Sequence, residues 1–199
     1  MTETLYSRLE IPENDRESSI RPDAAAYLHQ FIKEHGLSRT MEIGMAYGCS
    51  TAHIIAATQT RHVAIDPYQH CYGAGDVGIR NLERLGLVQH LDLRRELSRQ
   101  ALPRLADRGE QFDFIFVDGG HRFDEVFPDF ALSDPLLVEG GYIMFDDAWM
   151  ASVKHTAGFI RTNRVDYQEV PSRHWNLLIF RKTGRDERRW DHFKEFCQK

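Results

Sequence analysis

Cysteine is scarce in this sequence, and long apolar runs are missing. The 199 residues include three cysteines, at positions 49, 71 and 197. An odd number without close spacing does not predict a disulfide framework, so we expect a cytoplasmic protein with reduced thiols. No apolar run approaches the roughly 20 residues of a membrane helix, and the first residues lack the basic and apolar stretches of a signal peptide. We therefore expect neither secretion nor a membrane partner.

An excess of positive charge is also missing. The chain has 25 Lys and Arg against 30 Asp and Glu, which gives a formal net charge of -5. Proteins that bind the phosphate backbone usually show a basic excess. The densest basic stretch, residues 181–189, is interrupted by acids and is typical of a solvated turn and helix start. We therefore expect no nucleic-acid partner.

Short apolar segments alternate with helical patterns after residue 20. The pattern predicts strands at residues 40–43, 62–65, 87–93, 112–117, 142–145, 166–170 and 175–180. It predicts helices at residues 22–35, 50–58, 77–85, 98–106, 152–163 and 186–196, with a helical region that ends at residue 138. Short apolar strands separated by helices indicate an α/β doubly wound domain with a parallel sheet. The last two strands are close enough to predict an antiparallel hairpin.

The length fits one domain with a short extension. Residues 1–20 are polar and irregular, and we expect them to form an arm or lid, or a contact in a homodimer. We expect residues 21–199 to form a single domain.

Four of the predicted strands end in or beside an acid. These acids are Glu42, Asp66, Asp118 and the pair Asp146-Asp147. Ligands of doubly wound sheets bind outside the carboxyl ends of the strands. Clustered carboxylates repel one another unless they meet cations or hydroxyl groups. The sequence therefore predicts a ligand site at this edge of the sheet.

The segment after the first strand is rich in glycine. Gly44 and Gly48 allow a tight turn and close approach of a ligand, and the start of the following helix favours an anionic group. The G-x-x-x-G spacing differs from the G-x-G-x-x-G of dinucleotide sites. Asp66, about 20 residues further on, is placed to accept hydrogen bonds from ribose hydroxyls. These features predict a nucleoside ligand without a pyrophosphate, unless the glycines merely close a strand–helix turn.

The run Glu42-Ile43-Gly44 with Gly48-Cys49-Ser50 resembles the first motif of class I S-adenosylmethionine (SAM)-dependent methyltransferases. The resemblance covers residues 37–180. It implies a Rossmann-like seven-stranded sheet of order 3-2-1-4-5-7-6 with an antiparallel last strand. It also implies that SAM is bound by Glu42, Gly44, Tyr47, Gly48, Ser50, Asp66, Leu97, Ser98 and Asp118, with the methionine part at the glycines, the ribose at Asp66 and the adenine beside Leu97-Ser98.

The later half of the chain resembles the small-molecule O-methyltransferases of the catechol and sugar type. In their metal-dependent branch, acids after the fourth and fifth strands bind Mg²⁺, and a base lies three residues after the first acid. The resemblance implies Asp118, Asp146 and Asp147 as metal ligands, and Asp118 and His121 as catalytic residues, with His121 the general base. Taken one at a time, these residues also fit ordinary structural roles. Asp118 could stabilise a turn, Asp146-Asp147 could cap a helix, and His121 could be a solvated histidine.

This arrangement is chemically coherent. Mg²⁺ prefers about six oxygen ligands, so three carboxylates leave room for two neighbouring substrate hydroxyls and a water. The ion would lower the pKa of a bound hydroxyl, and a histidine with an ordinary pKa of about 6.5 could take the proton. Candidates to line the acceptor site are Tyr47, Tyr68, His70, Tyr72, Trp149, His174 and Trp175. Cys49 has no neighbouring base, so we interpret it as a small filler rather than a nucleophile.

The predicted function is transfer of a methyl group from SAM to a hydroxyl of a small molecule, assisted by Mg²⁺. A sugar diol, a catechol or a hydroxy acid would offer the vicinal oxygens that a metal favours. Three alternatives stay open: a metal-independent methyltransferase of another small molecule, a nicotinamide-dependent oxidoreductase, and a module with this fold that does not turn over substrate.

Overall fold

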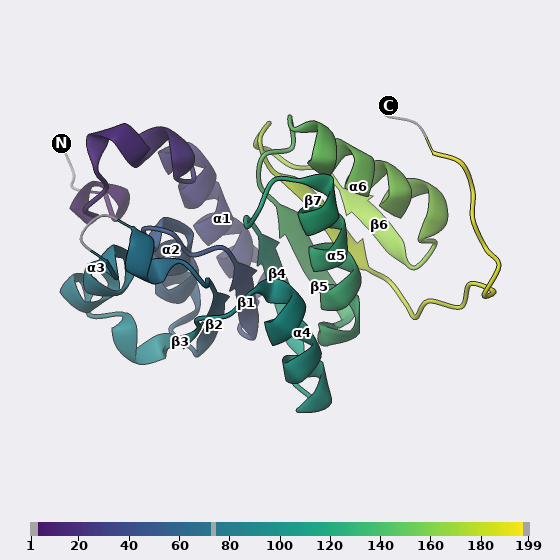
Figure 1. Ribbon diagram of the computed structural model, residues 1–199, viewed down its shortest axis with the longest axis horizontal. Helices are drawn as coiled ribbons and strands as arrows, with labels where there is room; N and C mark the ends of the chain where they lie inside the picture. The colour runs from purple at the N-terminus through teal and green to yellow at the C-terminus, as the bar shows by residue number, and fades with distance from the viewer. Residues whose placement is uncertain (1–3, 73–74, 197–199) are drawn as a thin grey trace.

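The computed structural model describes residues 4–72 and 75–196 and places helices on both faces of one sheet (Figure 1). The strands are β1 (Thr40–Ile43), β2 (His62–Ile65), β3 (Leu91–Arg94), β4 (Phe112–Val117), β5 (Leu137–Phe145), β6 (Tyr167–Val170) and β7 (Leu178–Lys182). Their order in the sheet is β3-β2-β1-β4-β5-β7-β6. Strand β7 runs antiparallel to β5 and β6, and the other neighbours are parallel. The predicted doubly wound fold and strand order are therefore confirmed.

Two helical layers cover the sheet because adjacent side chains of each strand point to opposite faces. The helices are α1 (Pro22–His35), α2 (Cys49–Thr58), α3 (Val77–Leu85), α4 (Ser98–Asp107), α5 (Phe123–Ser133) and α6 (Ala151–Asn163). Helices α4, α5 and α6 bury their apolar residues with Met41 and Ile115 of the sheet. Helices α1 and α2 cover the other face at Phe114 and Phe116, and α3 extends this layer. Among the described residues, no helix is long and apolar enough to cross a membrane.

The helix predicted at residues 186–196 is wrong, because this segment contains neither helix nor strand. The amide side chain of Asn163 explains part of the difference. It accepts a hydrogen bond from Lys194 N at 2.7 Å and donates one to Lys194 O at 3.0 Å, so it takes both backbone groups that a helix would use. The segment also buries little apolar surface against the domain, since Trp190 is 94% exposed, and packing of an apolar face supplies most of the stability of a helix in a protein.

Three predicted boundaries shift. Residues 88–90 form a 3-10 turn, so β3 begins at Leu91 rather than residue 87. Helix α5 ends at Ser133 because Pro135 cannot continue it, and β5 begins at Leu137 after another 3-10 turn. Strand β7 begins at Leu178 rather than residue 175, because the preceding residues belong to the connection from β6.

Residues 4–20 lie against the domain rather than away from it. They contain two 3-10 turns, Tyr6–Arg8 and Glu13–Ser18. The side chain of Asn81 in α3 holds both backbone groups of Glu10, with its Oδ1 2.8 Å from Glu10 N and its Nδ2 3.0 Å from Glu10 O. Ile20, at the end of the segment, is buried. An arm or lid remains the prediction for this segment.

Candidate active site

A cavity of about 440 Å³ lies at the carboxyl ends of β1, β2 and β4. This is the edge of the sheet where the sequence predicts a ligand, and the volume is typical of a small-molecule site. Its walls come from the turn after β1, the segment after β2, the start of α4, the turn after β4, the first half of α5, and residues 19 and 20. Of the predicted cofactor residues, Gly44, Tyr47, Ser50, Asp66, Leu97, Ser98 and Asp118 line the cavity directly.

Gly44 is required by the close approach of two strand ends. Its φ is +91°, in the region that favours glycine, and a Cβ at this position would lie 2.0 Å from the carbonyl oxygen of Asp118. Gly48 has a φ of +75° and immediately precedes α2. The glycines therefore shape the turn as predicted, and Gly44 lets the ends of β1 and β4 meet.

Glu42 lies beneath this turn and is fully buried. Its carboxylate accepts hydrogen bonds from the hydroxyls of Ser50, at 2.7 Å, and Thr51. On its other side, His62 Nε2 lies 3.3 Å from Glu42 Oε1, and Thr40 Oγ1 lies 2.8 Å from His62 Nδ1. Glu42 thus ties the start of α2 to the sheet. His62, which sequence reasoning missed, completes this buried network.

Asp66 supports the same turn from the end of β2. Its Oδ2 accepts hydrogen bonds from Met45 N at 3.1 Å, Ala46 N at 2.8 Å and Gln69 Nε2 at 3.0 Å. Its Oδ1 accepts one from Tyr68 N at 2.7 Å. A carboxylate offers about four acceptor sites, so a ribose hydroxyl would have to share or displace one of these donors.

Removing the charge of Asp66 should loosen the turn. In Asp66→Asn the amide group cannot accept all of these bonds, and its NH₂ would face backbone N–H groups. We expect the free energy of unfolding to fall by about 2 kcal/mol, and binding of S-adenosylhomocysteine (SAH) to weaken about tenfold. Urea denaturation and calorimetry measure the two effects. Unchanged values for both would show that Asp66 does not organise the turn.

Two tyrosines, one within the glycine turn and one after β2, are in contact with each other at the cavity. The hydroxyl of Tyr47 donates a hydrogen bond to Asp15, and burial raises the pKa of Tyr47 above its ordinary value. The ring of Tyr72 meets that of Tyr47 edge to face, with centroids 5.4 Å apart. Burial likewise raises the pKa of Tyr72, to about 12. Both hydroxyls are therefore neutral at physiological pH. Burial also raises the pKa of the Cys49 thiol to about 12, which fits a filler role.

His121 lies between two carboxylates from neighbouring strand ends. Its Nε2 is 3.0 Å from Asp147 Oδ2 and 3.8 Å from Asp118 Oδ1. One potential ligand atom from each of the three residues falls within 4.8 Å of the others. Hydrogen bonding to Asp118 and to Asp147 raises the pKa of His121 to about 10, and the interaction with His121 lowers the pKa of Asp147. The imidazole is therefore protonated at neutral pH in this arrangement.

Asp146 occupies a different environment from Asp147. It is 5% exposed, and its Oδ1 accepts hydrogen bonds from Asn176 Nδ2 at 2.5 Å and Asp147 N at 2.9 Å. Burial, reinforced by the charge of Asp118, raises the pKa of Asp146 to about 8. Burial also raises the pKa of Asp118, to about 6. The role of Asp146 as a metal ligand stays a prediction, because it lies outside the group formed by His121, Asp118 and Asp147.

Asn176 is a site residue that sequence reasoning missed. It lies in the connection between β6 and β7 and is buried. Its Nδ2 also lies 3.4 Å from Asp147 Oδ1, and its backbone O accepts a hydrogen bond from Ala148 N at 3.0 Å. Asn176 therefore fixes the turn that carries both acids. No sequence signal pointed to it, because its partners are about 30 residues away.

The predicted acceptor-site residues divide into two groups. Tyr47, Tyr68 and Tyr72 line the cavity, whereas His70, Trp149, His174 and Trp175 do not belong to its walls. Trp149 still reaches the acidic turn, where its Nε1 donates to Asp147 Oδ1 at 3.0 Å. Trp149 and Trp175 are exposed by 54% and 65%. Their contact with an acceptor stays a prediction.

Comparisons with known proteins agree with the fold. The O-methyltransferase TomG from Streptomyces achromogenes, involved in tomaymycin synthesis and solved in complex with SAM, is 18% identical. The alignment covers 88% of this chain and 92% of TomG, with a TM-score of 0.73. An O-methyltransferase from Bacillus cereus, solved in complex with SAH, is 19% identical, with 86% and 85% of the two chains covered and a TM-score of 0.72. At this level of identity, these structures show the fold.

A search of curated proteins gave no match. The sequence itself provides the assignment, because residues 41–148 match the family described as a methyltransferase domain. That match spans the glycine turn, Asp66, His121 and both acids that follow β5. The chain therefore belongs to the methyltransferase-domain family, as its first motif indicates.

Proposed function

We propose that the protein transfers a methyl group from SAM to a hydroxyl group of a small molecule. The observation that carries this proposal is a single cavity in which the glycine turn and Asp66 meet Asp118 and His121. The first two features suit a nucleoside, and the second two can manage the proton of a hydroxyl group. The solved O-methyltransferases of the same fold bind SAM or SAH, which supports the same donor here.

The residues of the turn would hold the donor. The start of α2 presents free backbone N–H groups to a carboxylate, and Glu42 keeps this helix end in place. A ribose would take hydrogen bonds at Asp66 in exchange for the Gln69 amide. When bound, SAM supplies a methyl group on a sulfonium as the electrophile and leaves as SAH. The remaining task of the protein is to position the hydroxyl in line and to receive its proton.

His121 is the proposed proton acceptor. Its Nε2 faces the two carboxylates that would also attract a polar acceptor, and its side chain is 45% exposed. Asp147 and Asp118 orient the ring, and Trp149 and Asn176 in turn hold Asp147. The imidazole must lose its proton before it can take one from the acceptor hydroxyl, so the electrostatic environment of Asp118 and Asp147 controls its availability.

The donor set fits a divalent cation. Burial raises the pKa of Asp118 and of Asp146, and the neighbouring carboxylates raise both further, whereas His121 lowers the pKa of Asp147. A cation would offset the repulsion among these carboxylates. Hard oxygen donors of this kind suit Mg²⁺. A bound Mg²⁺ would supply Lewis-acid assistance by lowering the pKa of a hydroxyl group.

Removal of divalent metal should therefore slow methyl transfer. We expect EDTA to lower turnover at least about tenfold and added Mg²⁺ to restore it, measured as SAH formation by mass spectrometry. Ca²⁺, which is larger and less strictly octahedral, serves as the matched control ion. If EDTA does not change turnover, the proposed Mg²⁺ requirement is wrong and the protein is a metal-independent methyltransferase.

The first test of the transferase itself is calorimetry with SAM and SAH. The expected result is one binding site for each. A panel that contains a catechol, a sugar diol and a hydroxy acid then tests the acceptor, with methylated product detected by mass. Binding of NADH instead of SAH would overturn the proposal in favour of an oxidoreductase, and binding of neither would favour a non-catalytic module.

We also propose that residues 1–20 act as a lid in a cytoplasmic enzyme. Ser19 and Ile20 line the cavity, and Asp15 accepts the hydroxyl hydrogen bond of Tyr47. These contacts support a role of the segment at the proposed donor site. Two cysteines in the described part of the chain, Cys49 and Cys71, are unpaired, which supports a reducing compartment.

A further inference from the structure

The connection between β6 and β7 carries a buried histidine that the proposed methyl transfer does not use. His174 is 9% exposed. Its ring lies nearly parallel to that of Tyr27 in α1, with an interplanar angle of 22° and centroids 6.5 Å apart. The imidazole therefore lies between α1 and the loop that brings Asn176 to the two acids after β5. A buried polar side chain in such a place needs partners for its nitrogens.

The two ring nitrogens of His174 face groups of opposite character. The backbone N–H of Asn176 donates a hydrogen bond to Nδ1, over 3.2 Å. On the other side of the ring, Nε2 lies 3.3 Å from Oδ2 of Asp23, in the first turn of α1. A backbone N–H can only donate, so Nδ1 is the acceptor, and the proton of the neutral imidazole lies on Nε2, beside the carboxylate. These neighbours select one tautomer and one orientation of the ring.

From His174 the polar contacts continue to the proposed proton acceptor. The side-chain amide of Asn176 donates hydrogen bonds to Asp146 Oδ1 at 2.5 Å and to Asp147 Oδ1 at 3.4 Å. Asp147 Oδ2 in turn lies 3.0 Å from His121 Nε2. A chain of contacts thus runs from α1 through His174 and Asn176 to the carboxylate beside His121.

The backbone of this connection is held independently of the imidazole. Ser172 Oγ donates to the backbone O of His174 at 2.9 Å and accepts from its backbone N at 3.1 Å. Leu177 N donates to the same backbone O at 3.2 Å. Loss of the ring would keep these hydrogen bonds but leave the backbone N–H of the buried Asn176 without its acceptor, which is costly. Asn176 would then shift, and its amide would no longer hold the two acids in place.

We propose that His174 is a positioning residue for methyl transfer, which fixes Asn176 and thereby the carboxylate that orients His121. This inference rests on the proposed function, since it takes His121 as the proton acceptor. The role requires no contact between His174 and the acceptor. Misplacement of a reacting group by about 1 Å can cost about 10²-fold in rate, so a residue outside the cavity can control turnover.

His174→Ala tests this role by the kinetic constant that it changes. The acceptor is the member of the panel of catechol, sugar diol and hydroxy acid that the wild type methylates. We expect kcat to fall about 10- to 100-fold, because His121 is no longer aligned. The KM for the acceptor and the dissociation constant of SAH should change by less than about threefold, because the donor site and the cavity walls stay intact. A histidine that bound the acceptor directly would instead raise KM.

Two further variants separate positioning from a loss of structure. In His174→Asn, the side-chain oxygen takes the place of Nδ1 and can accept from the N–H of Asn176, so kcat should return to within about threefold of the wild type. Arg173→Ala changes the preceding residue, whose side chain is 72% exposed and pairs with Glu34, and should keep full activity. Thermal unfolding shows whether each variant is folded.

Nitrogen NMR provides a measurement that does not depend on turnover. The imidazole signals of His174 in the wild type can be assigned by their absence in His174→Asn. Their chemical shifts should show an unprotonated Nδ1 and a protonated Nε2 in the neutral ring. A protonated Nδ1 would contradict the hydrogen bond from Asn176 and overturn the inference.

The kinetic outcomes separate the inference from the function on which it rests. If the wild type forms no methylated product from any member of the panel, the proposed function fails, and the inference fails with it. If the wild type is active but His174→Ala keeps its kcat or raises KM alone, the function stands and the inference is overturned. The same holds if His174→Asn is as slow as His174→Ala. A loss confined to kcat and restored by His174→Asn supports the positioning role.

Discussion

His121→Ala should lower the turnover of methyl transfer by a factor of about 10² to 10⁴, the usual contribution of a positioned general base. The imidazole is the basic side chain held against both Asp118 and Asp147. Its loss removes the proposed proton acceptor but leaves the glycine turn and Asp66 intact. We therefore expect SAH binding, measured by calorimetry, to change by less than about threefold. His155→Ala, an exposed histidine on α6, is the matched control and should retain full activity.

The pH dependence of turnover by the wild-type protein tests the role of His121 in a second way. Because Asp118 and Asp147 raise the pKa of His121 to about 10, the ring is protonated and inactive as a base at pH 7 when no metal is present. Activity in EDTA should therefore increase as the pH rises toward 10. Added Mg²⁺ competes for the two carboxylates and should shift the rise to lower pH. A flat profile, or full turnover by His121→Ala, would show that another group takes the proton.

The sequence was informative about this site wherever the relevant residues follow a buried strand. Apolar strands fix which segments pair, and the carboxyl ends of the parallel strands meet at one edge. Asp66, Asp118 and Asp147 could therefore be placed together from the order of the elements. The two adjacent acids after β5 could not be distinguished in this way. Asp147 adopts a φ of +52°, and the side chains of Asp146 and Asp147 have different partners: Asp146 binds Asn176, and Asp147 faces His121.

Residues brought in by loops and by the chain ends were harder to predict. Asn176 carries no periodic or motif signal, and its role depends on contacts with a distant segment. The closing segment also illustrates this limit. Its spacing favours a helix, but the tertiary contact between Asn163 and Lys194 uses backbone groups that a helix would need, and tertiary contacts outweigh local propensity.

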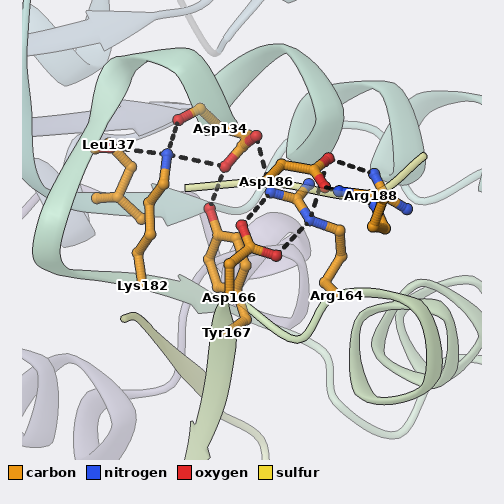
Figure 2. A network of polar contacts seen from close by, with 8 residues as sticks. All are labelled: Asp134, Leu137, Arg164, Asp166, Tyr167, Lys182, Asp186 and Arg188. Carbon is orange, nitrogen blue, oxygen red and sulfur yellow. Dashed lines mark hydrogen bonds and ion pairs between the residues drawn. The ribbon is translucent and has the colours of Figure 1, made fainter. Parts of the chain in front are cut away.

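A buried ion-pair network lies where β6 begins and β7 ends (Figure 2). We expect it to contribute strongly to the stability of the fold. Arg164 is 4% exposed, and its Nη2 lies 2.6 Å from Asp166 Oδ2 and 2.8 Å from Asp134 Oδ2. The guanidinium also lies 5.0 Å from the ring centroid of Tyr167. On the other side of Asp134, Lys182 Nζ is 3.0 Å from Asp134 Oδ1. One guanidinium thus compensates the buried carboxylate of Asp166 and the half-buried carboxylate of Asp134.

Arg164→Met should lower the free energy of unfolding by about 3 to 5 kcal/mol. The methionine replaces much of the volume, but Asp166, which is 2% exposed in its side chain, loses its partner and stays buried. Removing one member of a buried pair costs this much because the remaining charge is left uncompensated. Urea denaturation measures the change. Arg161→Met is the control, since its pair with Glu169 is more than a third exposed on both sides and should be worth less than about 1 kcal/mol.

The deficit of Arg164→Met should depend on pH. Burial opposes ionisation of Asp134, but Lys182 and Arg164 together lower its pKa below the ordinary value. The pKa of Asp186 is lowered to about 2, first by Arg188 and also by Arg164. Carboxylates with a lowered pKa stabilise the fold above their unfolded pKa of about 4, and this contribution is lost as the pH falls toward 2. The gap between wild type and Arg164→Met should therefore be largest near pH 7, where the unpaired carboxylate of the variant is most costly, and narrow as the pH falls toward 2. A gap that widens in acid, or a variant as stable as Arg161→Met at pH 7, would show that the network does not stabilise the fold in this way.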